Sequence, residues 1–87
     1  MNDESPLQFP CDFPIKVMGV GSPGFQALIV ELVRRRAPDL DETRVRVRDS
    51  RAGRYQSVTV TVNARDRAQL DAIYQDLNGH PHIKLVL

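Results

Sequence analysis

Cysteine and tryptophan are nearly absent from this sequence: its 87 residues include one cysteine, Cys11, and no tryptophan. A single cysteine excludes an internal disulfide and a metal site built from several thiolates. Long apolar runs are also missing, since no stretch approaches the roughly 20 residues that a membrane-spanning helix needs. The acidic N-terminal residues lack the basic and apolar regions of a secretory signal. We therefore expect a cytoplasmic protein that has no membrane partner.

An excess of charge of one sign is missing as well. Twelve basic and eleven acidic residues give a net charge of +1, so no long-range field attracts the chain to nucleic acid or anionic lipid. The composition, 41% hydrophobic and 26% charged, is typical of a single small globular domain. Residues 1–12 contain Pro6 and Pro10 and show no helical or strand period. We therefore predict a flexible N-terminal tail at residues 1–12 and one domain at residues 13–87.

Catalytic motifs are missing too. The sequence has no nucleophile elbow, P-loop, HExxH or paired-carboxylate motif. His80 and His82 have no cysteine or carboxylate cluster nearby, so they are weak candidates for a metal site. Cys11 has no histidine beside it in the sequence and is interpreted as an inert thiol. We expect no enzymatic activity, no cofactor and no metal.

The sequence does contain a clear succession of strand and helix periods. Alternating apolar residues predict strands, and apolar residues at helical spacing predict helices. The strands are expected at residues 13–20, 43–49, 54–63 and 82–87, and the helices at residues 23–36 and 66–78. This order predicts an α+β fold: a ferredoxin-like βαββαβ sandwich whose four-stranded antiparallel sheet has the order 4-1-3-2 and carries both helices on one face.

Several local signals predict how these elements begin and how they face. Ser22 followed by Pro23 predicts a helix N-cap and a first helical residue. Asp66 and Gln69 form the pattern of a capping box, and Gly79 marks the end of the second helix. The last strand is expected to turn one set of side chains toward the core and the other away from it. The inward set is Ile83, Leu85 and Leu87, and the outward set is His82, Lys84 and Val86.

The segment GVGSPG, residues 19–24, matches the glycine pattern that holds a dinucleotide at a helix N-terminus. A dinucleotide fold needs buried parallel strands, whereas the strands here alternate with arginine and threonine. Pro23 also lacks one of the backbone N–H groups that would receive a phosphate. We therefore interpret the glycines as permitting a sharp turn. Gly19, Gly21, Ser22 and Gly24 remain candidates for a ligand-binding turn.

The sheet face away from the helices is the second candidate site. We expect it to carry Lys16, Arg44, Arg46, Arg48, Tyr55, Thr59, His82 and Lys84. A solvated cationic face is the simplest interpretation. A platform for RNA is an alternative, although such platforms stack bases on several aromatic residues and this face offers only Tyr55. A surface for a second copy of the chain, or for a different protein, is the other alternative.

Four segments closely resemble the YbeD-like family of small bacterial proteins. They are residues 13–19, 53–60, 70–77 and 84–87, and the likeness extends over nearly all of residues 9–87. The resemblance implies the ferredoxin-like fold and a similarity to ACT regulatory domains, which bind amino acids at domain interfaces. It also implies a metabolic setting, because genes of this family lie near those for lipoate attachment in many bacteria. No catalytic residue is carried over, since the family has none established.

Together these observations predict a non-enzymatic, ACT-like regulatory or protein-interaction domain. Its partner would be a small metabolite or a protein, which includes a second copy of the chain in a homodimer. A link to lipoate metabolism is also expected from the resemblance. The alternative is a nucleic-acid-binding module that uses the arginine-rich open face.

Overall fold

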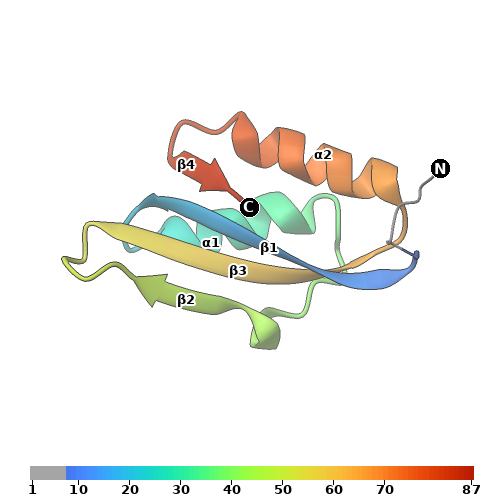
Figure 1. Cartoon of the computed structure of the whole chain (residues 1–87), viewed down its shortest axis with the longest axis horizontal. Coiled ribbons are helices and arrows are strands. Elements are labelled where there is room, and N and C mark those ends of the chain that lie inside the picture. Colours follow the sequence, from blue (N-terminus) through green and yellow to red (C-terminus); the bar gives the residue numbers. More distant parts are fainter. Residues whose placement is uncertain (1–7) are drawn as a thin grey trace.

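The computed structural model describes residues 8–87 and confirms the predicted order of elements and sheet topology (Figure 1). The strands are β1 (Cys11–Val20), β2 (Arg46–Asp49), β3 (Tyr55–Ala64) and β4 (Ile83–Val86), and the helices are α1 (Phe25–Arg34) and α2 (Arg67–Asn78). All neighbouring strands are antiparallel, in the order β2-β3-β1-β4. This is the predicted order counted from the opposite edge.

The hydrophobic core lies between the sheet and the helices, and Figure 1 shows the sheet in front of α1. Alternate residues of β1 and β3 point into this layer, so Ile15, Val17, Val58 and Val60 are completely buried. Their partners include Ile29 and Val33 from α1 and Ile73 and Leu77 from α2. No helix of residues 8–87 covers the opposite side of the sheet (Figure 1), and we call that side the open face. Within residues 8–87, no helix is long and apolar enough to span a membrane.

Helix α1 begins two residues later than predicted. Its N-cap is Gly24, which makes no side-chain capping bond, so the predicted Ser22 cap was wrong. Ser22 instead accepts a hydrogen bond from the Phe25 N–H through its backbone carbonyl, at 3.2 Å. Pro23 and Gly24 occupy the turn that this bond closes, and the helix starts only after it.

Helix α2 begins with the predicted capping box. Asp66 accepts a hydrogen bond from the Gln69 N–H at 2.8 Å, and the Gln69 side chain accepts one from the Arg65 N–H at 2.8 Å. In a regular capping box the Gln69 side chain would bond the N–H of the N-cap residue, Asp66. Here it bonds the N–H of the preceding residue, Arg65. Gln69 also donates to the backbone carbonyl of Arg36 at 2.8 Å, which ties the start of α2 to the end of α1.

Two of the predicted strands, β1 and β2, begin at other residues than expected. Strand β1 begins at Cys11, where Cys11 and Asp12 pair with Ala64 and Asn63, two residues before the predicted start of the domain. Residues 1–7 of the predicted tail lie outside the described residues. Strand β2 is shorter than the predicted 43–49, because Glu42–Arg44 forms a turn of 3₁₀ helix capped by Asp41.

The chain faces the opposite way from the prediction from Leu85 onward, whereas Ile83 faces the core as predicted. Val86 pairs with Val17 and Ile83 pairs with Gly19, but the register shifts between Met18 and Gly19. The shift is a β-bulge that inserts one extra residue into β4, and this changes which side chains point inward. Ile83 and Val86 pack against the core, so the inward placement of Leu85 and Leu87 was wrong.

Candidate interaction surface on the open sheet face

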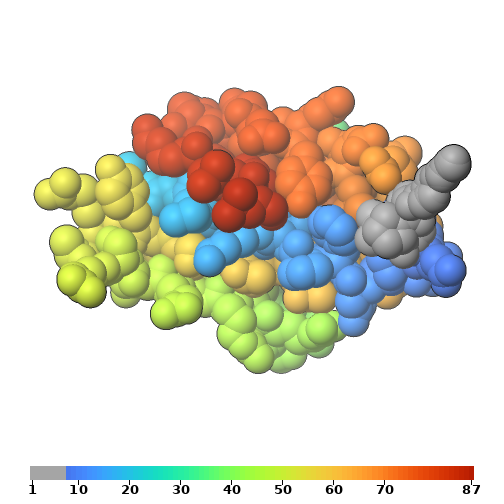
Figure 2. Space-filling view, in the orientation of Figure 1, coloured from blue at the N-terminus to red at the C-terminus, as the bar shows by residue number. Residues whose placement is uncertain are grey.

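The strand registers arrange the open face in rows of side chains that run across the sheet. One row is Arg48, Ser57, Met18 and Leu85, and the next is Arg46, Thr59, Lys16 and Leu87. Each row is basic on β2, small and hydroxylated on β3, and apolar at β4. Figure 2 shows this face, with β4 (red) lying directly beside β1 (blue).

Five apolar side chains lie near one another on the β1 and β4 side of this face, and we call them the apolar band. They are Met18, Val20, Tyr55, Leu85 and Leu87. Exposed fractions are 48% for Val20, 45% for Tyr55, 46% for Leu85 and 61% for Leu87. The backbone of Leu87 is held by two hydrogen bonds with Lys16 and by one from the Tyr74 hydroxyl. The band therefore has a defined position on the sheet.

A small hollow of about 200 Å³ adjoins the apolar band. It exists because Ser57 is short, while its neighbours across the strands, Arg48 and Met18, are long. Lys16 and Tyr55 complete the walls, together with Asp49, Ser50 and Gln56. We call this the basic hollow. It brings together three of the predicted open-face residues: Lys16, Arg48 and Tyr55.

The four cations predicted on β1 and β2 differ in what they contact. Arg44 lies in the 3₁₀ helix rather than in β2, and its guanidinium pairs with Asp12 at 3.1 Å, so its predicted place as a strand residue was wrong. The hydrogen bond from Arg44 lowers the pKa of Asp12 below its ordinary value. Arg46 reaches the backbone carbonyl of Thr43 at 3.3 Å. Among residues 8–87, no ion pair involves Lys16 or Arg48.

The glycine segment begins in strand β1 and ends in the turn before α1. A Cβ at Gly19 would clash with the His82 carbonyl oxygen and would lie 2.7 Å from the Phe25 ring. Gly19 lies within β1, and within residues 8–87 only Gly53 has a positive φ among the glycines. The Gly21 N–H donates to the Arg54 carbonyl at 2.9 Å. The interpretation as a sharp turn was therefore wrong for Gly19.

The loop after β1 does meet the start of β4. Ser22 and Lys84 line a hollow of about 340 Å³ with Val20, Pro81 and His82. Beside this hollow, the His80 side chain accepts a hydrogen bond from the His82 N–H. The two imidazole rings meet edge to face, with their centroids 5.2 Å apart. No group of three metal-ligating side chains occurs among the residues that the structure describes.

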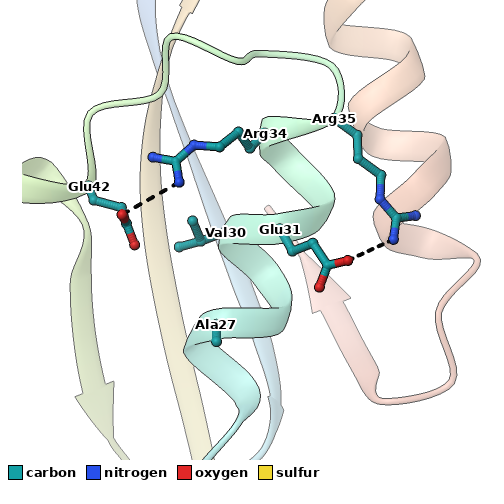
Figure 3. Close-up of a pocket in the computed structure, with 6 residues that line it drawn as sticks. All are labelled: Ala27, Val30, Glu31, Arg34, Arg35 and Glu42. Carbon is teal, nitrogen blue, oxygen red and sulfur yellow. Dashed lines mark hydrogen bonds and ion pairs between the residues drawn. The ribbon is translucent and has the colours of Figure 1, made fainter.

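A larger groove of about 450 Å³ lies on the other side of the molecule, between α1 and the 3₁₀ helix (Figure 3). Ala27 and Val30 form its apolar part. Its charged groups are already paired with one another: Arg34 contacts Glu42 at 3.5 Å and Arg35 contacts Glu31 at 3.0 Å. The cations of this groove are therefore less available to a ligand than those of the basic hollow.

Comparisons with known proteins identify the family. Residues 4–87 match the family described as "Protein of unknown function (DUF493)". The chain belongs to the DUF493 family. A UPF0250 protein of Nitrosomonas europaea is 46% identical over 87 residues and covers 100% of both chains. A UPF0250 protein of Paraburkholderia phymatum is 53% identical over 85 residues, 98% of this chain and 96% of the relative. The predicted family resemblance is confirmed.

A solved structure also has the fold of this DUF493 protein. The solution structure of protein HP0495 from H. pylori superimposes with a TM-score of 0.73 and covers 97% of this chain and 88% of its own. The sequence identity is 13%, so the likeness concerns the fold alone.

Sequence reasoning found the basic part of this surface and missed its apolar part. Leu85 and Leu87 were predicted to face inward because a regular β4 would alternate without interruption. The available signal was Gly19, since glycine within a strand often accompanies a bulge or a close approach of another chain segment. Gly19 lies at the position where the register of β4 shifts.

Proposed function

We propose that this DUF493 protein is a non-enzymatic interaction domain that binds a protein partner on the open face of its sheet. The observation that carries the proposal is the apolar band, in which four large side chains stay about half exposed on the face without helices. Contiguous exposed apolar side chains on a soluble domain mark interaction surfaces. Complete burial of one leucine side chain is worth about 1.5–3 kcal/mol.

Fewer observations support the alternative that the open face binds nucleic acid. Among residues 8–87, Tyr55 is the one aromatic side chain that the strand registers place on the open face, and sheet platforms for RNA use several. Arg44 is engaged by Asp12, which leaves fewer free cations than the sequence suggested. Metabolite binding and a link to lipoate metabolism stay predictions of the family resemblance.

Two variants with substitutions on opposite faces of the sheet test the proposal. Leu85→Ser with Leu87→Ser removes two of the five side chains of the apolar band. Val47→Ser removes a comparable exposed apolar side chain, 37% exposed, on the helix side of the sheet. The tagged full-length chain and both variants would be used to capture proteins from the native cells, with quantification of every protein retained.

We expect one or a few proteins to be retained by wild type and by Val47→Ser, and to be at least about fivefold depleted with the double variant. A loss of about 1 kcal/mol of binding free energy accounts for this depletion. Equal retention by all three chains would contradict the proposal. Turnover of a metabolite by the pure protein would contradict its non-enzymatic part.

A further inference from the structure

We infer that the partner places a carboxylate in the basic hollow, so that this protein recognises an acidic side chain followed closely by apolar ones. The inference rests on the proposed function and adds the chemistry of the segment that binds. It comes from the position of the basic hollow next to the apolar band, since the two share Met18 and Tyr55.

The charges in the basic hollow favour an anionic group. Lys16 and Arg48 both line it, and neither forms an ion pair within residues 8–87. Asp49 also contributes to the lining of the hollow. The strand register places its side chain on the helix side of the sheet, like that of Val47, and its carboxylate accepts a hydrogen bond there from the Gln56 side-chain amide at 2.9 Å. Two cations against one carboxylate leave a positive charge for an incoming anion. Tyr55 and Ser57 add hydroxyl groups that can donate to a carboxylate.

The size of the hollow favours one side chain over a whole metabolite. Its volume of about 200 Å³ is below the range of about 300–1,000 Å³ typical of small-molecule sites. The hollow therefore has room for one carboxylate side chain of a larger partner.

The arrangement favours a different protein over a second copy of this chain. A two-fold pair through the open face would bring the Lys16, Arg46 and Arg48 side chains of both copies to one interface. The open-face carboxylate Asp12 is already bound by Arg44 and Asn63. An acidic partner would instead neutralise the basic hollow, and complementary charges of this kind determine specificity.

The distance between the two features defines the segment. Neighbouring strands lie about 4.8 Å apart. Ser57 lies one such spacing from Met18 and two from Leu85. An extended chain spans this distance in about two or three residues. The expected segment therefore has an acidic residue and an apolar residue about two positions apart.

Two synthetic peptides test this inference on the full-length protein. The first is acetyl-Glu-Ala-Leu-Ala-Leu-amide, and the second has glutamine in place of glutamate. Each would be titrated into ¹⁵N-labelled protein at low ionic strength while the amide shifts of Met18, Ser57 and Leu85 are followed. We expect the glutamate peptide to bind about two- to fivefold more tightly, the range of a partly exposed ion pair. Arg48→Gln should remove this preference, and Arg67→Gln, on the first residue of α2, should keep it.

Each outcome has one meaning for the inference. Equal binding of both peptides, absence of binding, or a preference that survives in Arg48→Gln would overturn it. Inorganic phosphate and succinate, titrated in the same way, report on small anions. If either binds as tightly as the glutamate peptide at the same amides, the hollow is a site for a free anion, and the inference fails. The proposed function fails separately, when the Leu85 and Leu87 variant retains every captured protein.

Discussion

Gly19 occupies a position where the structure leaves no room for a side chain. A Cβ there would clash with the Phe25 ring at the start of α1 and with the His82 carbonyl before β4. The residue therefore lets three segments that are distant in the sequence come into contact, and it lies where the register of β4 shifts. Gly19, the first residue of the GVGSPG segment, therefore has a role in close packing.

We predict that Gly19→Ala destabilises the protein by about 1–3 kcal/mol, since the new methyl group overpacks a buried contact. The matched control is Gly24→Ala, because a Cβ at Gly24 would meet nothing within 4 Å. That control should change the free energy of unfolding by less than about 1 kcal/mol. Urea denaturation of the three proteins measures both effects. Equal midpoints for Gly19→Ala and wild type would show that the packing around Gly19 adapts.

At the scale of elements, one buried amide joins the two helices. Gln69 donates to the Arg36 carbonyl at the end of α1 and accepts from the Arg65 N–H at the start of α2. We predict that Gln69→Ala costs about 1–3 kcal/mol of stability, since it leaves two backbone groups without partners. Gln26→Ala, on the exposed side of α1, should change stability by less than about 0.5 kcal/mol. Thermal or urea unfolding compares them, and a similar small loss in both variants would contradict this role.

An ion pair joins the same two segments and makes stability depend on pH. Arg36 donates to both carboxylate oxygens of Asp76, at 2.8 and 3.2 Å, and holds the pKa of Asp76 below its ordinary value of 3.8. Because folding lowers this pKa, the stabilisation is present above the ordinary value and is lost as the pH falls through the lowered one.

We predict that the wild type loses more stability than Asp76→Asn between about pH 5 and pH 3, because the asparagine side chain does not titrate. Urea midpoints at the two pH values measure the difference. Parallel losses in the two proteins would show that other carboxylates cause the acid sensitivity.

Most elements could be predicted from the sequence, because each depends on a local pattern. The alternation of Val58, Val60 and Val62 predicted β3, and Asp66 with Gln69 predicted the start of α2. The face of β4 could not be predicted, since it depends on a bulge caused by contacts between distant segments. The same reason applies to the site. Lys16, Arg48 and Tyr55 were identified from alternation, whereas the exposure of Leu85 and Leu87 follows from the bulge.

At the scale of the whole molecule, charge and apolar surface are separated on one face. The basic side chains lie on β2 and β1, and the apolar band lies on β1 and β4 with Tyr55 from β3. We predict that the pure chain is a monomer of 9.8 kDa at tens of micromolar, because self-association through this face would bring like charges together. Sedimentation velocity measures this directly. A dimer that dissociates on Leu85→Ser would identify a second copy as the occupant of the face.

Site-specific photo-cross-linking in living cells tests the central claim, that the open face binds another protein. A photoreactive phenylalanine analogue would replace Leu85 in one chain and Val47 in another, so that the two probes lie on opposite faces of the sheet. We predict a discrete protein adduct from position 85 on illumination and none from position 47. Adducts from position 47 alone, or none from position 85, would contradict the account.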